Sequence, residues 1–185
     1  MLSAAIASLT LSGNTITGSK EKRRGGWECD LDLSGLTSMG EAMAASKTLT
    51  SVDFSNCKMS VAGVTELSKF IPSMAAVTSL TISKNKIGSE GGTALVEAIK
   101  SSNLQTIDIG KPLLIRDKHD SDVLDLSQQE LYPGQVVILA WWLTTPASAA
   151  LNSIDISGEC FRCTFATDCE KSIFTSPKSD SQRVP

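Results

Sequence analysis

The chain has 185 residues, a formal net charge of −3 and 20% charged residues. These values exclude the strongly basic composition of a typical nucleic-acid-binding protein and give no reason to expect attraction to an anionic membrane. The longest apolar run, residues 136–143, is far shorter than the roughly 18 residues that a membrane-spanning helix needs, so we expect no direct membrane insertion. Serine and threonine together number 42, which indicates that short polar side chains recur along the chain.

Short apolar patterns of the form L-x-x-L-x-L-x-x-N/C-x-L recur along the chain and predict strands. Three copies are well kept: Ile6, Leu9, Leu11, Asn14 and Ile16; Leu49, Val52, Phe54, Cys57 and Met59; and Val77, Leu80, Ile82, Asn85 and Ile87. Three copies are degraded: Leu104, Ile107, Ile109 and Leu114, with Pro112 in the place of Asn; Leu124, Leu126, Gln129 and Leu131; and Leu151, Ile154, Ile156 and Phe161, with Glu159 in that place. The copies that begin at positions 49, 77 and 104 are 28 and 27 residues apart.

Helical periodicity lies between these strands. Val64 and Leu67 share one face of a segment that ends at Pro72, and Leu95 and Ile99 share one face of the segment that follows Ile87. Each unit therefore combines one short strand with one helix.

The segment LTISKNKIGSEGGTALVEAIKSSNLQTIDI, residues 80–109, resembles the leucine-rich-repeat family, in its ribonuclease-inhibitor-like type. The resemblance covers about residues 6–161. It implies an α/β fold, a right-handed leucine-rich-repeat solenoid of about five to six irregular repeats, with parallel strands on the concave face and helices on the convex face. Asn14, Asn85 and Cys57 are then expected to turn inward, where their side chains satisfy backbone groups of the loops.

The spacing divides the chain into four parts. Residues 1–110 hold leucine-rich repeats, with an insertion loop at 17–35 that explains the long first interval of 43 residues between positions 6 and 49. Residues 111–122 form an irregular connector, 123–161 further degenerate repeats, and 162–185 a Cys-containing, Ser/Pro-rich tail. The insertion carries Lys20, Lys22, Arg23, Arg24 and Trp27. It is either a basic, aromatic contact loop or a solvated excursion with Trp27 folded back on the solenoid.

A helix is predicted over about residues 133–145, and it has no polar face on a helical wheel. Trp141 and Trp142 lie in it. A solenoid helix should be apolar on only part of its circumference, so either another element of this chain covers the outer side or another protein does.

Side chains alternate along a strand, so the residues between the two apolar anchors of each strand point to the concave surface. They are Thr10, Asp53, Thr81, Asp108, Asp125 and Asp155. Strands about 4.8 Å apart would place Asp108, Asp125 and Asp155 in succession, where like charges repel unless they are solvated or face a cationic partner. These short polar residues either are simply compatible with a tightly curved parallel sheet or bind a basic or hydroxyl-bearing partner.

Signatures of catalysis are missing from the sequence, which contains no GxSxG, HExxH, P-loop or GxGxxG pattern. His119 lies among charged residues and is expected to be solvated. Cys160, Cys163 and Cys169 supply three thiols, whereas a tetrahedral zinc site needs four ligands. A metal or enzymatic site at these cysteines is therefore the remote alternative, and we predict neither an enzyme nor a cofactor.

Five cysteines are an odd number, and Cys29 and Cys57 stand apart from the other three, so the pattern argues against a disulfide framework. An intracellular, reducing compartment is the simpler interpretation, with export as the alternative. The N-terminal stretch lacks the basic segment with which a signal peptide begins, so no cleavage is predicted.

The sequence thus predicts a non-catalytic protein–protein interaction module or scaffold whose partner is another protein and not a nucleic acid. The candidate contact residues are Asp53, Thr81, Asp108, Asp125, Asp155, Trp27, Trp141 and Trp142. Five residues precede Ile6, so the first strand is expected to be an uncapped edge. The alternative is a structural subunit that docks in a larger assembly, or self-associates, through its ends and its Trp-rich helix.

Overall fold

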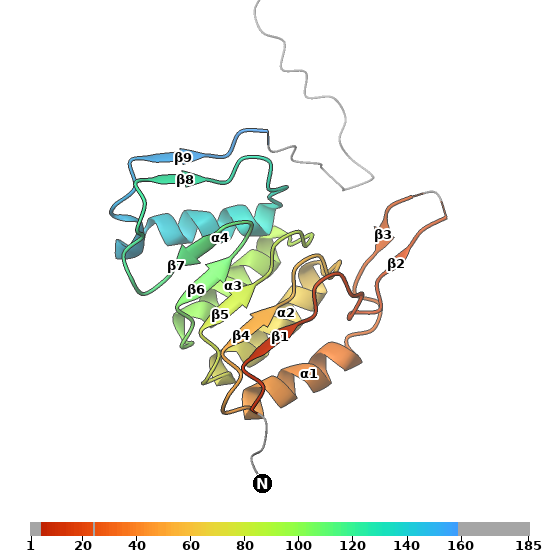
Figure 1. Ribbon diagram of the computed structural model, residues 1–185. Coiled ribbons are helices and arrows are strands. Elements are labelled where there is room, and N and C mark those ends of the chain that lie inside the picture. Colours follow the sequence, from red (N-terminus) through yellow and green to blue (C-terminus); the bar gives the residue numbers. More distant parts are fainter. Residues whose placement is uncertain (1–4, 24, 159–185) are drawn as a thin grey trace, which may run out of the picture.

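The structure is a computed structural model that describes residues 5–23 and 25–158, in which strands and helices alternate (Figure 1). The strands are β1 (Ser8–Thr10), β2 (Lys20–Glu21), β3 (Trp27–Glu28), β4 (Ser51–Asp53), β5 (Ser79–Thr81), β6 (Thr106–Asp108), β7 (Pro112–Leu114), β8 (Val123–Asp125) and β9 (Ser153–Asp155). The helices are α1 (Ser34–Ala45), α2 (Val61–Phe70), α3 (Ser89–Lys100) and α4 (Pro133–Leu143), with 3-10 turns η1 (Ile71–Ser73) and η2 (Pro146–Ser148). Arg24, Glu159, Cys160, Phe161 and the expected tail with Cys163 and Cys169 lie outside the described residues.

The main sheet has the order β1-β4-β5-β6-β7, and its first four strands are parallel. Their central residues pair in one row, Leu9 with Val52, Val52 with Leu80 and Leu80 with Ile107. Helices α1, α2 and α3 pack successively against one another and cover one face of this sheet (Figure 1). The predicted alternation of parallel strands with helices is therefore confirmed.

The parallel series ends after β6. The next strand, β7, returns antiparallel to β6, with Ile107 opposite Leu113, and Leu113 is fully buried. Strands β8 and β9 pair parallel with each other in a separate two-stranded sheet. The connector expected at residues 111–122 thus contains an antiparallel strand that closes the edge of β6, and β8 does not continue the main sheet.

The apolar positions of the repeats form the core between sheet and helices. Asn85 is fully buried, and its amide bonds the backbone carbonyls of Phe54 and Ile82 at 2.7 and 3.0 Å. Cys57 is also fully buried, with its thiol 3.2 Å from the Leu11 carbonyl. The inward orientation expected for Asn85 and Cys57 is confirmed. Asn14 differs, because it is exposed and bonds only the neighbouring Leu11 and Ser12 carbonyls.

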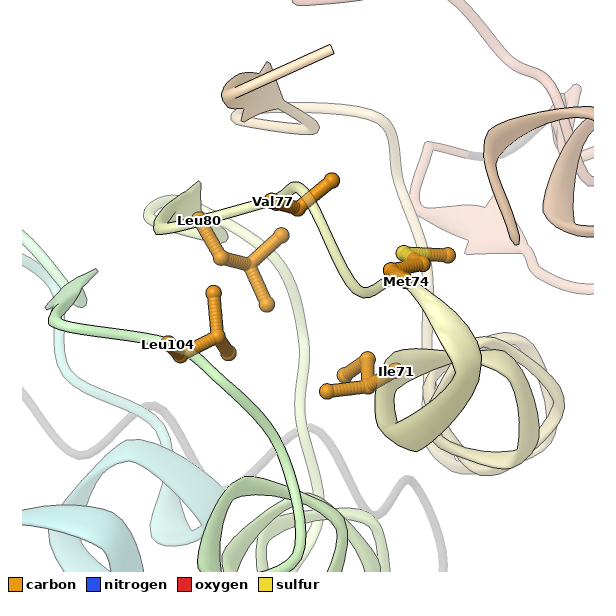
Figure 2. A pocket seen from close by; sticks show the side chains of 5 residues that line it. All are labelled: Ile71, Met74, Val77, Leu80 and Leu104. Carbon is orange, nitrogen blue, oxygen red and sulfur yellow. The ribbon is translucent and has the colours of Figure 1, made fainter. Parts of the chain in front are cut away.

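Apolar side chains meet where η1 and the following loop pack on β5 and on the segment that leads to β6 (Figure 2). The five that line this small depression are Ile71, Met74, Val77, Leu80 and Leu104. All five are buried core residues. Because no polar side chain lines it, the depression offers no group that could orient a polar substrate.

Helix α4 takes the place beside α3 that the helix of a regular next repeat would fill. The two helices touch at Gly92 and Gly134, where a Cβ atom on Gly92 would lie 2.4 Å from the Gly134 carbonyl oxygen. The Gly134 N–H donates to the Ile87 carbonyl at 2.7 Å, and the Gln135 amide donates to the Asn85 carbonyl at 3.0 Å. These contacts join the start of α4 to the loop after β5. Gln135 and Asn85, which one of them links, are 50 residues apart in the sequence.

The expected insertion contains a two-stranded antiparallel hairpin, β2–β3, and its last two residues already belong to α1. Buried Ser19 joins the base of this hairpin to the main body: its hydroxyl accepts from the Asp30 N–H and donates to the Lys58 carbonyl, both at 3.0 Å. One carboxylate oxygen of Asp30 accepts the N–H groups of Ser60 and Gly63 at 2.9 and 2.8 Å. Asp30 thus caps the N-terminus of α2, whose own N-cap residue makes no side-chain cap.

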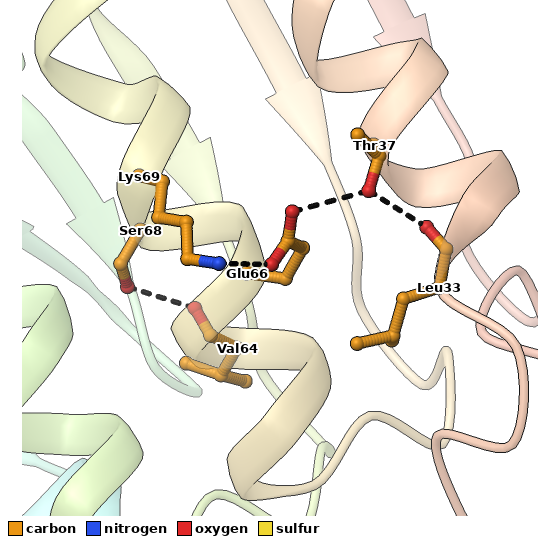
Figure 3. Close-up of polar contacts among 6 residues, drawn as sticks. All are labelled: Leu33, Thr37, Val64, Glu66, Ser68 and Lys69. Atoms are coloured by element: carbon orange, nitrogen blue, oxygen red, sulfur yellow. Dashed lines mark hydrogen bonds and ion pairs between the residues drawn. The ribbon is translucent and has the colours of Figure 1, made fainter.

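Glu66 links α1 to α2 (Figure 3). Its carboxylate accepts from Lys69 Nζ at 2.5 Å and from the Thr37 hydroxyl at 3.1 Å, and its side chain is 17% exposed. The bond from Lys69 is the main reason why the pKa of Glu66 is lowered from its ordinary value of 4.5. The carboxylate form is therefore favoured in the folded chain.

Glu66→Gln is expected to reduce the acid sensitivity of the fold. A lowered folded-state pKa contributes stability above the unfolded value of 4.5, and this contribution disappears as the pH falls through the lower folded value. Between neutral pH and pH about 3, the wild-type chain should lose about 0.5 kcal/mol more than Glu66→Gln in urea titrations. Glu97→Gln is the matched control, because Glu97 forms the same i,i+3 pair but is 65% exposed. An equal pH response of Glu66→Gln and wild type would contradict the role of this link.

Candidate partner-binding face

The face of the main sheet opposite the helices, here called the open sheet face, carries the polar residues that flank each central strand residue. The central residues Val52, Leu80 and Ile107 are buried, whereas their neighbours are half-buried. Register aligns one row across the four parallel strands: Thr10, Asp53, Thr81 and Asp108. The strand alternation expected from the sequence therefore places Asp53, Thr81 and Asp108 together.

Asp125 and Asp155 lie elsewhere. They pair with each other in the separate β8–β9 sheet, and both are exposed. The residue opposite Asp108 is Pro112 of β7, not Asp125. The expected succession of Asp108, Asp125 and Asp155 is therefore wrong, because β7 occupies the edge of β6 on which the next parallel strand would pair.

Each of the four aspartates bonds its own backbone. One carboxylate oxygen accepts the N–H group two residues later, at 2.7 Å for Asp53, 2.8 Å for Asp108, 2.9 Å for Asp125 and 2.8 Å for Asp155. At Asp125 the hydrogen bonds from Ser127 also lower the pKa of the carboxyl. The recurring D-x-S/G spacing in the sequence signals these turns, and sequence reasoning missed it.

The three tryptophans have different surroundings. Trp27, in β3, is half-buried with the Lys58 ammonium 5.4 Å from the centre of its ring. Trp141 is half-buried on α4. Trp142 is fully buried, and its indole N–H donates to the Leu114 carbonyl at 2.6 Å. The prediction of Trp142 as a partner contact is therefore wrong: it is a core residue, because Leu114 of β7 and His119 pack against it.

His119 lies beside Trp142. It was expected to be solvated, and the structure differs from that expectation. It is half-buried, and its ring meets the indole edge-on with the centroids 5.5 Å apart. The rest of α4 is covered in the same manner: Ile138 and Leu139 are buried, while Leu143 remains 43% exposed. The apolar circumference of α4 was expected to be covered either by this chain or by another protein. Neighbouring elements of this chain cover most of it.

The thiols of the described residues are protonated at neutral pH. Burial raises the pKa of Cys57 to about 11, and burial is also the largest cause of the raised pKa of Cys29. A thiolate is the form that attacks or binds metal, so neither thiol is poised for that chemistry. Within residues 5–23 and 25–158, no three His, Cys, Asp or Glu side chains gather as metal ligands would, and no helix there is long and apolar enough to span a membrane.

Comparison with known families matches residues 45–68 and 76–96 to a leucine-rich-repeat model. These two segments of the chain are similar to leucine-rich repeats. The two matched repeats span β4 with most of α2 and β5 with most of α3. Stacked leucine-rich repeats create extended surfaces, and proteins of this family generally act as non-enzymatic modules that bind other proteins.

No curated protein matches the chain. Among solved structures, "Leiomodin-1 Actin-Binding Site 2 (ABS2)" is similar, at 14% sequence identity and a TM-score of 0.46 over 82% of this chain and 71% of that chain.

Proposed function

We propose that this protein is a non-catalytic interaction module, a scaffold that binds another protein through the open sheet face. The observation that carries the proposal is the aligned row Thr10, Asp53, Thr81 and Asp108, on a face that none of the described helices covers (Figure 1). A row of short polar side chains on a rigid parallel sheet is pre-organised, so little side-chain entropy is lost on binding.

The chemistry of the row favours a partner with basic or hydroxyl-bearing side chains. Asp53 and Asp108 each use one carboxylate oxygen for an internal turn. The other oxygen of each has no hydrogen-bond partner among the described residues and is free to accept from Lys, Arg, Ser or Thr of a partner. Thr81 separates the two charges in the row, which reduces their mutual repulsion and spaces two acceptors along the face.

The finer description of the fold is part of the same proposal. A ribonuclease-inhibitor-like, right-handed solenoid of about five to six repeats is supported by the 27- and 28-residue spacing and by a full helix between successive parallel strands. Crossovers between parallel strands are right-handed in nearly all proteins.

The test is a capture experiment from the native source with the full chain as bait, comparing wild type with Asp53→Asn/Asp108→Asn. Asparagine keeps the oxygen that closes each turn but removes the charge, so the fold should persist and partner affinity should fall about tenfold. Asp117→Asn/Asp120→Asn is the matched control, because it removes the same charge from exposed positions outside the sheet face. Affinities are measured by surface plasmon resonance once the captured protein is identified.

A second candidate function is a structural subunit that docks through its β1 end. An apolar groove of about 270 Å³ lies there, lined by Leu11, Ile16, Gly35, Leu36 and Met39, and Ile6, which precedes β1, is 67% exposed. If the Asp53→Asn/Asp108→Asn variant captures its partner as well as wild type does, the open sheet face is not the contact surface and the β1 end becomes the leading candidate.

A further inference from the structure

Basic side chains gather along the rim formed by the hairpin and by the loops after β4 and β5. The basic rim consists of Lys22, Lys58 and Lys86. Lys58 lies over the ring of Trp27, the Lys86 N–H donates to the Met59 carbonyl at 2.9 Å, and the charges of Lys86 and Lys22 both act on the Cys29 thiol. Segments from three parts of the sequence therefore present cations to one region.

The repeat geometry itself brings two of these charges together. Lys58 and Lys86 each stand seven residues after a serine, and those serines, Ser51 and Ser79, are partners in register. The two lysines therefore occupy equivalent sequence positions of adjacent repeats, and the bond from the Lys86 N–H to the carbonyl of Met59, the neighbour of Lys58, brings the two loops together. Like charges in such positions repel one another, which favours binding of an anion between them.

The rim cations lack carboxylate partners among the described residues. The ion pairs found there are Lys69–Glu66 on α2 and Lys100–Glu97 on α3, and neither includes a rim lysine. Lys58 instead donates to the side chain of Asn56. Lys58 also has a positive φ of 58°, a conformation that glycine or asparagine would adopt more readily.

Hydrogen bonds fix the base of the hairpin that supplies Lys22 and Trp27. Thr17 and Ser19 at its base are buried and bonded to each other at 2.9 Å. Asp30 follows the hairpin and accepts the Ser60 hydroxyl at 2.6 Å. Binding at the rim would therefore not need to order a free loop, which removes one of the usual costs of association.

We propose that the basic rim binds an acidic segment of a partner protein. Its carboxylates pair with Lys58 and Lys86, and its side chains pack against the indole of Trp27. A nucleic acid fits this surface less well, because the rim offers few cations in a chain whose net charge is −3, whereas a nucleic acid is usually held by many phosphate contacts. The rim is separate from the open sheet face, so this proposal does not depend on the function proposed above.

The test measures fluorescence anisotropy of a fluorescein-labelled polyglutamate peptide titrated with the full chain at low and high salt. Wild type should bind, with an affinity that falls as salt is added. Lys58→Gln/Lys86→Gln should weaken binding about tenfold, and Trp27→Ala should weaken it as well. Lys47→Gln/Lys118→Gln is the matched control, because it removes the same charge from exposed positions outside the rim and should bind like wild type.

Two outcomes would overturn the proposal. One is equal binding by the rim variant and the control variant, or no binding by wild type. The other is tighter binding of a labelled oligothymidylate or of phosphatidylserine vesicles than of polyglutamate. Circular dichroism of each variant shows that the fold is retained. Asp53→Asn/Asp108→Asn should bind the peptide at least as well as wild type, so failure at the rim and failure at the open sheet face can be told apart.

Discussion

Gly134→Ala is expected to lower the free energy of unfolding by about 3 kcal/mol. A Cβ atom at this position would lie 2.2 Å from Ile87 Cγ2 and 2.5 Å from the Gly88 carbonyl oxygen. The carbonyl belongs to the backbone that leads into α3, and it cannot move aside as the end of a long side chain could. The clash would separate α4 from α3 and strain the bond from the Gly134 N–H to Ile87. Urea denaturation followed by circular dichroism measures the loss.

Gly35→Ala is the control for this prediction. Gly35 also lies in a helix, but the atom nearest to an added Cβ is 3.6 Å away. Alanine favours a helix over glycine by about 1 kcal/mol, so this variant should be as stable as wild type or slightly more stable. Equal stability of Gly134→Ala and wild type would show that α4 does not approach α3 as closely as described.

Asn85→Ala should destabilise the fold by a similar amount, about 3 kcal/mol, for a different reason. The Asn85 amide donates to the Phe54, Ile82 and Ser83 carbonyls at 2.7, 3.0 and 3.3 Å. Its oxygen accepts the Met59 N–H at 3.2 Å. Alanine would leave these backbone groups without partners in the interior, where an unmade hydrogen bond costs far more than at the surface.

Asn14→Ala provides the matched comparison, because Asn14 holds the same position in the first repeat but is exposed. Its amide bonds the Leu11 and Ser12 carbonyls at 3.0 and 3.4 Å, and water can replace it there. The expected loss is below about 1 kcal/mol. Similar losses for the two variants in urea titrations would contradict the explanation from burial.

The strands and most helices could be predicted because their signals are local. The alternation around Val52, Leu80 and Ile107 defines a buried and an exposed side for each strand. The apolar period of residues 61–70 and 89–100 defines the helices between them. Helix α1 was not predicted, because it directly follows the insertion and its boundary residues belonged to the expected loop.

The candidate site was predicted in part. The positions of Asp53, Thr81 and Asp108 on one face followed from strand alternation, and register places them in one row. Their internal turns were missed, although the D-x-S/G spacing marks them. The basic rim was only partly visible, because Lys58 and Lys86 join the hairpin through the fold of the loops and not through sequence proximity.

The sequence by itself determined the repeat, its strands and helices, and the side of each strand that faces the core, because all of these depend on side chains within a few residues of one another. Only the tertiary structure decided where the parallel series ends, how Asp30 holds the hairpin against α2, and why Trp142 is buried. Each of these depends on contacts between segments that are distant in the chain, and a local pattern carries no information about which distant segment will cover it.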